Sequence, residues 1–293
     1  MRFVSAPGYW LKALERKFPM FLLLFDKQIR YNTYKIARCL KGVGCISSAK
    51  IQPRANPLMP KRAIFAILFT AAVVAGVLIY RNMTSAGARS NHVWEFLKDP
   101  ASHADWKIAA GSRCGNAPFI FPTDGMVGFL WNDSFKVSQR HQGIDIFAGT
   151  DVGVTPVIAA YDGYRTRLSD WKSSVIMRVP NDPLQPGRQI WLYYTHMANT
   201  EGTSFIVADF PPGTHERFVS AGTVLGYQGN YSGDPNNPVG VHLHFSIVQD
   251  DGKGNFRNEL DIRNTYDTSP YLGLELNATR NRGEIPLCLP PTL

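Results

Sequence analysis

The chain has 293 residues, of which 44% are apolar and 12% aromatic, so a disordered protein is excluded and a sizeable core can form. The net charge of +8 belongs to one end only: residues 1–62 hold 13 Lys and Arg against 2 Asp and Glu, whereas residues 63–293 hold 18 against 21. The charge therefore does not indicate a nucleic-acid partner for the bulk of the chain, and the sequence carries no Walker, Rossmann or nucleic-acid motif.

Residues 1–62 are predicted to form a basic cytoplasmic tail. "MPKR" at residues 59–62 stands directly before an apolar run, which is the layout of a signal sequence. This suggests the hypothesis that translation starts at Met59, in which case residues 1–58 are not part of the natural protein. Detection of a peptide from before Met59 by mass spectrometry would contradict the hypothesis.

Residues 63–80, "AIFAILFTAAVVAGVLIY", form an 18-residue run without a charge, close to the roughly 20 residues that cross a bilayer as a helix. The excess of Lys and Arg before this run predicts a cytoplasmic N-terminal side and an extracytoplasmic C-terminal part. A small-residue cleavage site, Ala86-Gly87-Ala88, leaves a cleaved signal and a secreted domain open. The apolar run is longer than a signal core, which favours an uncleaved anchor over a signal. A buried helix of a soluble domain rarely lacks charge for five turns, which favours the anchor over that alternative as well.

Residues 81–113 are predicted to be a partly helical connector. Whether part of this connector blocks the candidate site of the outer domain is left open. The four cysteines fall on both sides of the apolar run, with Cys39 and Cys45 in the tail. Cys114 and Cys288 flank the outer domain on the oxidising side, so we expect a disulfide between them, with two free thiols as the alternative.

Residues 114–273 are predicted to be an antiparallel β domain, followed by a tail at residues 274–293. Short apolar or alternating runs such as "GIDIF" and "QIWLYY" are separated by Gly, Pro, Asn and Asp, and few segments are long enough for a helix. The fold class is therefore mainly β, preceded by one transmembrane helix.

Four histidines of this domain stand in strand-like runs beside suitable partners. "RHQGID" contains His141 and Asp145, "YYTHM" contains His196, and "GVHLHF" contains His242 and His244. Side chains two apart in a strand share one face at about 7 Å, so the last two imidazoles point into one space. His92, His103 and His215 lack such partners and are interpreted as ordinary surface or core residues.

A catalytic zinc ion usually has three protein ligands and one open position. His141, Asp145 and His244 supply two imidazoles and one carboxylate, which predicts one Zn²⁺ site. His196 and His242 are left free beside it, where an imidazole can orient water, take its proton or support an oxyanion. This set indicates metal-assisted hydrolysis.

The runs "HQGIDIFAGTDVGVTPVIAAYDGY", "YYTHM" and "VSAGTVLGYQGNYSGDPNNPVGVHLHFSI" together resemble the lysostaphin and LytM type of zinc endopeptidase, metallopeptidase family twenty-three. The resemblance covers roughly residues 119–247. It implies a compact antiparallel β-sheet domain of the duplicated hybrid motif kind and hydrolysis of peptide cross-links in bacterial peptidoglycan. It implies zinc ligands at His141, Asp145 and His244 and catalytic histidines at His196 and His242.

Two departures from the family concern the substrate groove. The segment "NYSGDPNNPVGV" before His242 is longer than the short turn usual there, and a loop at residues 180–187 is also expected to shape the cleft. The alternatives to an active membrane-anchored endopeptidase are a catalytically silent relative that binds the wall or activates another wall hydrolase, and a binding module with a structural metal. The sequence leaves the bond that is cut and the oligomeric state undetermined.

Overall fold

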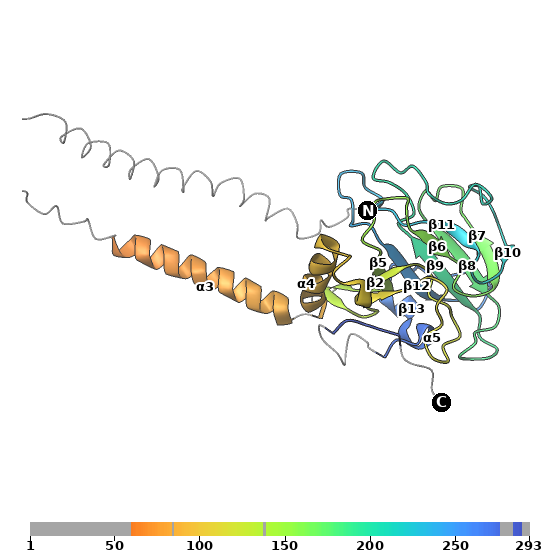
Figure 1. Cartoon of the computed structure of the whole chain (residues 1–293), viewed down its shortest axis with the longest axis horizontal. Coiled ribbons are helices and arrows are strands. Elements are labelled where there is room, and N and C mark those ends of the chain that lie inside the picture. The colour runs from red at the N-terminus through yellow and green to blue at the C-terminus, as the bar shows by residue number, and fades with distance from the viewer. Residues whose placement is uncertain (1–59, 84, 137–138, 276–283, 289–293) are drawn as a thin grey trace, which may run out of the picture. The chain divides into compact units, whose positions relative to one another are not determined.

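The structure is a computed structural model that describes residues 60–83, 85–136, 139–275 and 284–288. The predicted tail before residue 60, with Met59, Cys39 and Cys45, lies outside the described residues, as does much of the predicted C-terminal tail. In chain order the described elements are α3 (Lys61–Met83), α4 (Ser85–Lys98), the 3-10 helix η1 (Ala104–Trp106), β1 (Lys107–Ile108), β2 (Gly125–Phe129), β3 (Ser134–Lys136), β4 (Gln139–Arg140), β5 (Ile144–Phe147), β6 (Pro156–Ile158), β7 (Gly163–Thr166), β8 (Val175–Val179), β9 (Ile190–Thr195), β10 (Arg217–Val219), β11 (Val224–Tyr227), β12 (Leu243–Gln249), η2 (Ile262–Asn264), β13 (Thr265–Tyr266) and α5 (Ser269–Leu272) (Figure 1).

The strands form one large antiparallel sheet and two small ones. The nine-stranded sheet has the order β1-β2-β5-β12-β9-β8-β7-β10, with β13 paired to β12, and the small sheets are β11-β6 and β3-β4. Every strand pair within the described residues is antiparallel. The described part of the chain is thus mainly antiparallel β-sheet with few helices, which confirms the predicted class.

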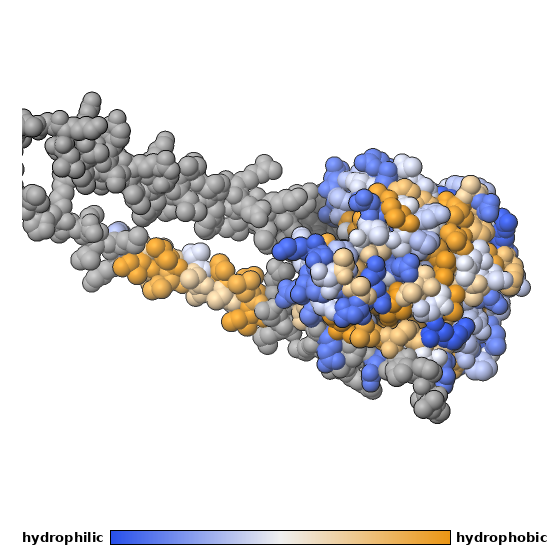
Figure 2. Space-filling model, viewed as in Figure 1, coloured by the Kyte–Doolittle hydropathy of each residue, from blue (hydrophilic) through white to orange (hydrophobic). Residues whose placement is uncertain are grey.

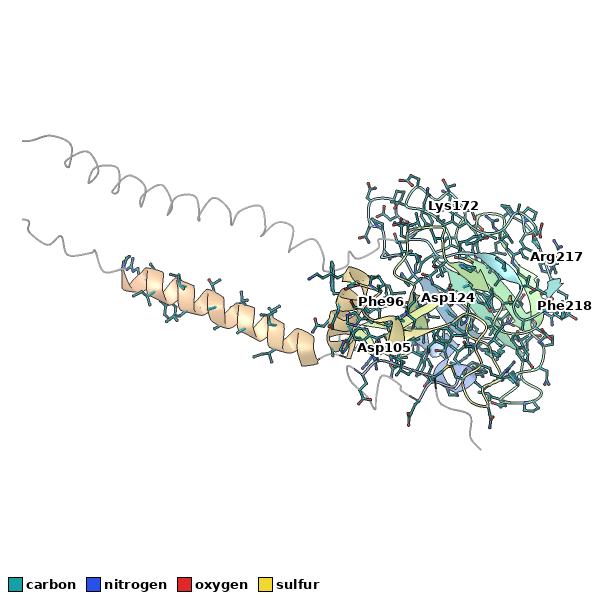
Figure 3. The ribbon with its side chains drawn as sticks, in the orientation of Figure 1. Phe96, Asp105, Asp124, Lys172, Arg217 and Phe218 are labelled. Carbon is teal, nitrogen blue, oxygen red and sulfur yellow. A yellow bond between two sulfur atoms is a disulfide. The ribbon has the colours of Figure 1, made fainter. Side chains whose placement is uncertain are left out.

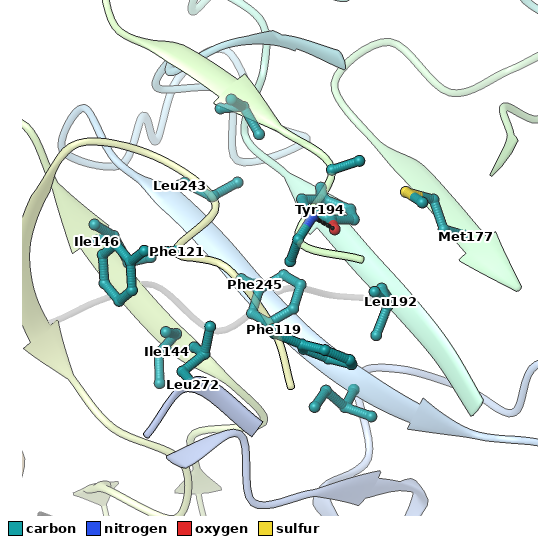
Figure 4. Close-up of a cluster of buried hydrophobic side chains, with 14 of the residues drawn as sticks. Phe119, Phe121, Ile144, Ile146, Met177, Leu192, Tyr194, Leu243, Phe245 and Leu272 are labelled. Atoms are coloured by element: carbon teal, nitrogen blue, oxygen red, sulfur yellow. Dashed lines mark hydrogen bonds between the residues drawn. The ribbon is translucent and has the colours of Figure 1, made fainter. Parts of the chain in front are cut away.

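Alternation along β12 separates the core from the site. Leu243, Phe245 and Ile247 are fully buried in the main hydrophobic cluster, whereas His244 and Ser246 project from the opposite face of the strand. Figure 4 shows Leu243 and Phe245 among the core side chains from neighbouring strands, including Ile144 and Leu192. The apolar positions of the central strands therefore fix which face carries the histidines.

Helix α4 packs against β2 and belongs to the fold of the β domain (Figure 1). Its Phe96, labelled in Figure 3, is fully buried in a cluster with Val93, Met126 and Phe147. Strand β1 also pairs with β2. Residues of the segment predicted as a connector thus contribute a helix and an edge strand to the domain.

Helix α3 contains the apolar run predicted to cross a membrane. Among the described residues it is the one helix long and apolar enough to do so, over Arg62–Ile79, and none of that stretch is buried. Figure 2 shows its apolar surface in orange. A signal sequence can meet the same criteria of length and composition, so the choice between anchor and signal stays a prediction.

A disulfide joins Cys114 to Cys288 across 174 residues of sequence, with a Cα–Cα distance of 4.8 Å. Next to it, Leu274 forms an isolated bridge with Cys288. The segment at residues 284–288 is therefore fastened to the start of the β domain.

The expectation that the loop at residues 180–187 shapes the cleft is wrong. This loop joins β8 to β9 at the end of the sheet where Val179, Ile190 and Gln249 lie side by side. His244 pairs with Thr195 at the opposite end of the same strands. The direction of the strands therefore places the loop and the histidines at opposite ends of the sheet. The residues near the loop do not indicate at which end it lies.

Candidate metal centre

The three predicted ligands come from two neighbouring strands and the turn before one of them. Asp145 on β5 and His244 on β12 stand directly opposite each other in the antiparallel ladder. His141 follows β4 and lies four residues before Asp145, so the chain returns its ring to the same face. His141 and Asp145 are only 5% and 8% exposed.

The ligand atoms converge to a small triangle. His141 Nε2 lies 3.0 Å from Asp145 Oδ1 and 3.1 Å from His244 Nδ1, and His244 Nδ1 lies 2.8 Å from Asp145 Oδ1. Donor atoms around a tetrahedral zinc at about 2.0–2.1 Å are about 3.3 Å apart. The three atoms would need to separate by about half an ångström or less to hold such an ion.

The hydrogen bond on the far side of the His141 ring decides what this triangle can bind. Nδ1 of His141 lies 2.9 Å from the carbonyl of Leu130, and a carbonyl only accepts, so we assign the proton to Nδ1. Nε2 of the neutral ring then presents a lone pair to the lone pairs of Asp145. A proton on His244 Nδ1 could form a hydrogen bond to Asp145 Oδ1 or to His141 Nε2, but it would leave the other contacts of the triangle without a proton. A divalent cation, by contrast, accepts electron pairs from all three atoms. The group of His141, Asp145 and His244 could thus hold a metal ion.

The protonation preferences follow from burial and from the charge of Asp145. Burial lowers the pKa of His141, but the adjacent carboxylate outweighs this and leaves the pKa raised. Burial favours a neutral Asp145, but His141 and His242 hold the pKa of that carboxyl well below its usual range. Burial also lowers the pKa of His244. The carboxylate is therefore ionised and available as a ligand at neutral pH.

The two remaining histidines, His196 and His242, lie beside the triangle. Their ring centroids are 4.6 Å apart, and His242 Nε2 is 3.5 Å from Asp145 Oδ1. The ring of His196 lies 6.2 Å from that of His244. The structure thus brings all five predicted site residues together.

Backbone carbonyls also orient these two imidazoles. Nδ1 of His196 donates to the carbonyl of Tyr231 at 2.7 Å, and Nδ1 of His242 donates to the carbonyl of Gly240 at 2.7 Å. With Nδ1 donating, Nε2 is the nitrogen of each ring that is available to accept a proton. Burial, together with the neighbouring His242 and His244, lowers the pKa of His196 to about 3. His196 is therefore neutral at physiological pH and can accept a proton.

His196 also has an unusual backbone. Its φ is 75°, a left-handed conformation that is costly for a residue with a side chain. Gly229 packs against it so closely that a Cβ at Gly229 would lie 2.5 Å from the His196 carbonyl oxygen. The close packing holds His196 in this conformation at the end of β9.

His242 lies one residue before β12, in an isolated bridge with Gly229, so the expectation that both histidines belong to the strand is corrected here. Its ring stacks on Phe147 with centroids 4.9 Å apart. Because His242 lies outside the regular strand, its ring can turn to Phe147 while His244 faces Asp145.

Gly143 lies between two metal-ligand positions, where the chain approaches β12 most closely. A Cβ at this position would lie 2.1 Å from the carbonyl oxygen of Phe245 and 2.8 Å from Cβ of Ser246. Gly143 therefore allows β12 to pass close to the chain between two metal-ligand positions.

The other three histidines lie away from the centre, in accord with their interpretation. His92 and His103 contact the ring of Trp106, with centroids 5.6 and 3.9 Å away. His215 lines a surface hollow with Arg178 and Glu216.

Several supporting groups gave no signal in the sequence. The carbonyls of Leu130, Tyr231 and Gly240 orient the rings, but every residue has a carbonyl, so no residue type marks them. Tyr194, two residues before His196, lies on the core face, where its hydroxyl accepts from the Ala160 N–H at 2.9 Å. The segment "NYSGDPNNPVGV" contributes two of the three carbonyls and thus borders the site.

Comparison with known proteins gives little to set beside this geometry. No model of a protein family matches the chain, and no curated protein matches it. One similar solved structure is a crystal structure from Ruminococcus gnavus assigned as a glycyl-glycine endopeptidase LytM, with 24% identity, 44% of each chain covered and a TM-score of 0.29. The matched part is less than half of that structure's chain, and at this TM-score the likeness carries no argument about the present chain.

Proposed function

We propose that the chain is a membrane-anchored zinc metalloendopeptidase that hydrolyses peptide cross-links of bacterial peptidoglycan. The observation that carries the proposal is the convergence of three ligand atoms, on His141, Asp145 and His244, to within 3.1 Å of one another, with the rings of His196 and His242 beside them. The sequence resemblance to the lysostaphin and LytM endopeptidases supports the substrate class.

His141, Asp145 and His244 would hold the ion. A bound zinc ion would supply Lewis acidity, which lowers the pKa of a water molecule toward about 7 and polarises the scissile carbonyl. The donor set also suits iron(II), so metal analysis of the purified protein assigns the ion.

His196 and His242 would handle the proton of the reaction. The water oxygen bonds to the carbonyl carbon, the C–N bond breaks, and the water proton passes through an imidazole Nε2 to the leaving amine. A low pKa keeps His196 unprotonated before the reaction. Once protonated, either ring can donate Nε2–H to the developing oxyanion, since its Nδ1–H stays on a backbone carbonyl.

The proposed location is the outer side of a bacterial cell membrane, with α3 as a single-pass anchor. The length and exposed apolar surface of α3 support this, together with the excess of Lys and Arg before it. Cleavage after Ala88 would instead release the β domain as a secreted enzyme.

The test uses the full chain in detergent micelles, loaded with zinc, on peptidoglycan of several defined wall types. We expect new free amino groups and shortened cross-links, identified by mass analysis of the muropeptides. Chelator-treated protein and His196→Ala should be inactive, whereas His215→Ala, which changes a histidine remote from the site, should be active. A folded, zinc-loaded wild type that leaves every wall type uncut refutes the enzyme, and binding to the wall without cleavage would support the silent relative.

A further inference from the structure

Arg89 on helix α4 makes an ion pair inside the domain. Its Nε lies 3.2 Å from Oδ2 of Asp133, and the two side chains are 2% and 0% exposed. A second nitrogen, Nη1, donates to the carbonyl of Glu284 at 2.6 Å. Buried charges are costly unless they are paired, so the contact with Asp133 holds α4 to the chain at that residue, and the contact with Glu284 holds it to residues 284–288.

Asp133, the partner of Arg89, belongs to a four-residue turn at residues 130–133 that forms hydrogen bonds with His141. The carbonyl of Leu130 accepts the ring Nδ1–H of His141. The backbone of His141 makes two further bonds to the turn: its N–H donates to the Asp133 carbonyl at 2.9 Å, and its carbonyl accepts the Asn132 N–H at 2.8 Å. The backbone and ring of this ligand are thus both fixed by one turn.

The carboxylate of Asp133 in turn fixes the turn. Its Oδ2 accepts the N–H of Leu130 at 2.7 Å, on the same residue whose carbonyl orients the imidazole. Asn132 within the turn has a φ of 69°, a conformation that needs support from its surroundings. Arg89 therefore contacts Asp133, and Asp133 in turn holds Leu130, so a single side chain separates Arg89 from the residue whose carbonyl orients His141.

We propose that Arg89 is a positioning residue for the metal centre: by pairing with Asp133 it holds the turn that orients His141, and so it makes metal affinity depend on helix α4. The inference rests on the proposed metal site. It assigns a functional role to a helix that follows α3, the helix that contains the predicted membrane segment, after a single residue.

Signal cleavage would change the surroundings of Arg89. A cut after Ala88 would make Arg89 the first residue of the released chain and would remove Ala86, which is 1% exposed in the first turns of α4. The anchored and the released forms would then differ at the positioning residue, and the released form is expected to bind the metal more weakly.

The test measures zinc affinity of the full chain in detergent micelles by competition with a chelator, without any substrate. Arg89→Met is expected to raise the Kd for zinc about 10- to 100-fold, the range typical of residues that orient a metal ligand. The absorption spectrum of the cobalt-substituted protein should change with it, because the His141 ring moves. Arg89→Lys keeps the charge but loses the planar fork, and it is expected to fall between wild type and Arg89→Met.

Arg188→Met is the matched control. Arg188 also pairs with a fully buried carboxylate, that of Asp182, but at the far end of the sheet, so its loss should lower thermal stability and leave the Kd within about twofold. Wild-type affinity in Arg89→Met, or an equal loss in Arg188→Met, overturns the proposal. If Arg89→Met does not fold, Arg89→Lys and Asp133→Asn decide by the same readout.

These outcomes separate the inference from the proposed function. A wild type that binds zinc but cuts no peptide refutes the enzyme and leaves the positioning role standing. A wild type that binds no zinc refutes both.

Discussion

Gly143→Ala tests how closely the two strands of the metal centre must approach. In the native backbone the new Cβ would lie 2.1 Å from the Phe245 carbonyl oxygen, whereas contacts below 3.0 Å are essentially never found for a Cβ. The chain at Gly143 and strand β12 must therefore separate by about 1 Å. Overpacking of this kind costs about 1–3 kcal/mol, and the upper end applies because the obstacle is backbone and cannot rotate away.

The same displacement reaches the ligands. Asp145 and His244 stand opposite each other across the two strands that would separate, with 2.8 Å between their ligand atoms. A misplacement of about 1 Å can cost about 100-fold in turnover, and the Kd for zinc should rise with it. Gly143→Ala should thus impair both stability and the metal centre.

The assay is thermal unfolding followed by circular dichroism, together with the zinc affinity. For a domain of this size, about 3 kcal/mol corresponds to a fall in Tm of about 6–12 °C. Gly240→Ala is the matched control, because its Cβ would meet only Phe147 Cε1, at 3.7 Å, beside the same site. A Gly143→Ala protein with the Tm and zinc affinity of the wild type would refute the reasoning.

Four further predictions concern the site and the domain. His244→Ala should lose bound zinc while His242→Ala retains it and loses turnover, as measured by metal analysis and muropeptide cleavage; equal zinc content would contradict the division of roles. His196→Ala should keep zinc and lose turnover, and a variant with normal turnover would show that its imidazole is dispensable. Reduction of the Cys114–Cys288 disulfide should lower the free energy of unfolding by about 2–4 kcal/mol, measured with and without reductant, and an unchanged value would show that the bridge constrains nothing. Burial raises the pKa of Asp250, but hydrogen bonds from Trp191 and Gln189 outweigh this and lower it, so its stabilising effect is present above about pH 4, the unfolded pKa, and is lost as pH falls through the lower folded pKa. The difference in unfolding midpoint between wild type and Asp250→Asn should therefore vanish at low pH, and a difference that persists there would contradict this.

The sequence by itself determined the composition of the candidate site. Imidazole and carboxylate side chains are chemically distinctive, and the spacing within "HQGID" and "HLH" is local, so His141, Asp145, His242 and His244 could be named before any fold was known. The class of the domain was equally accessible, because alternation of apolar and polar residues is a property of each strand alone.

Only the tertiary structure decided how these residues are held. Arg89 and Asp133 lie on separate elements, and nothing in either local sequence marks them as partners. The ring-orienting carbonyls of Leu130, Tyr231 and Gly240 belong to a group that every residue has, so their selection depends on where the chain passes. The loop at residues 180–187 was misplaced for the same reason, since strand pairing between distant segments sets which end of the sheet a loop occupies. Residue chemistry is local and readable from the sequence, whereas orientation arises from contacts between segments far apart in the chain.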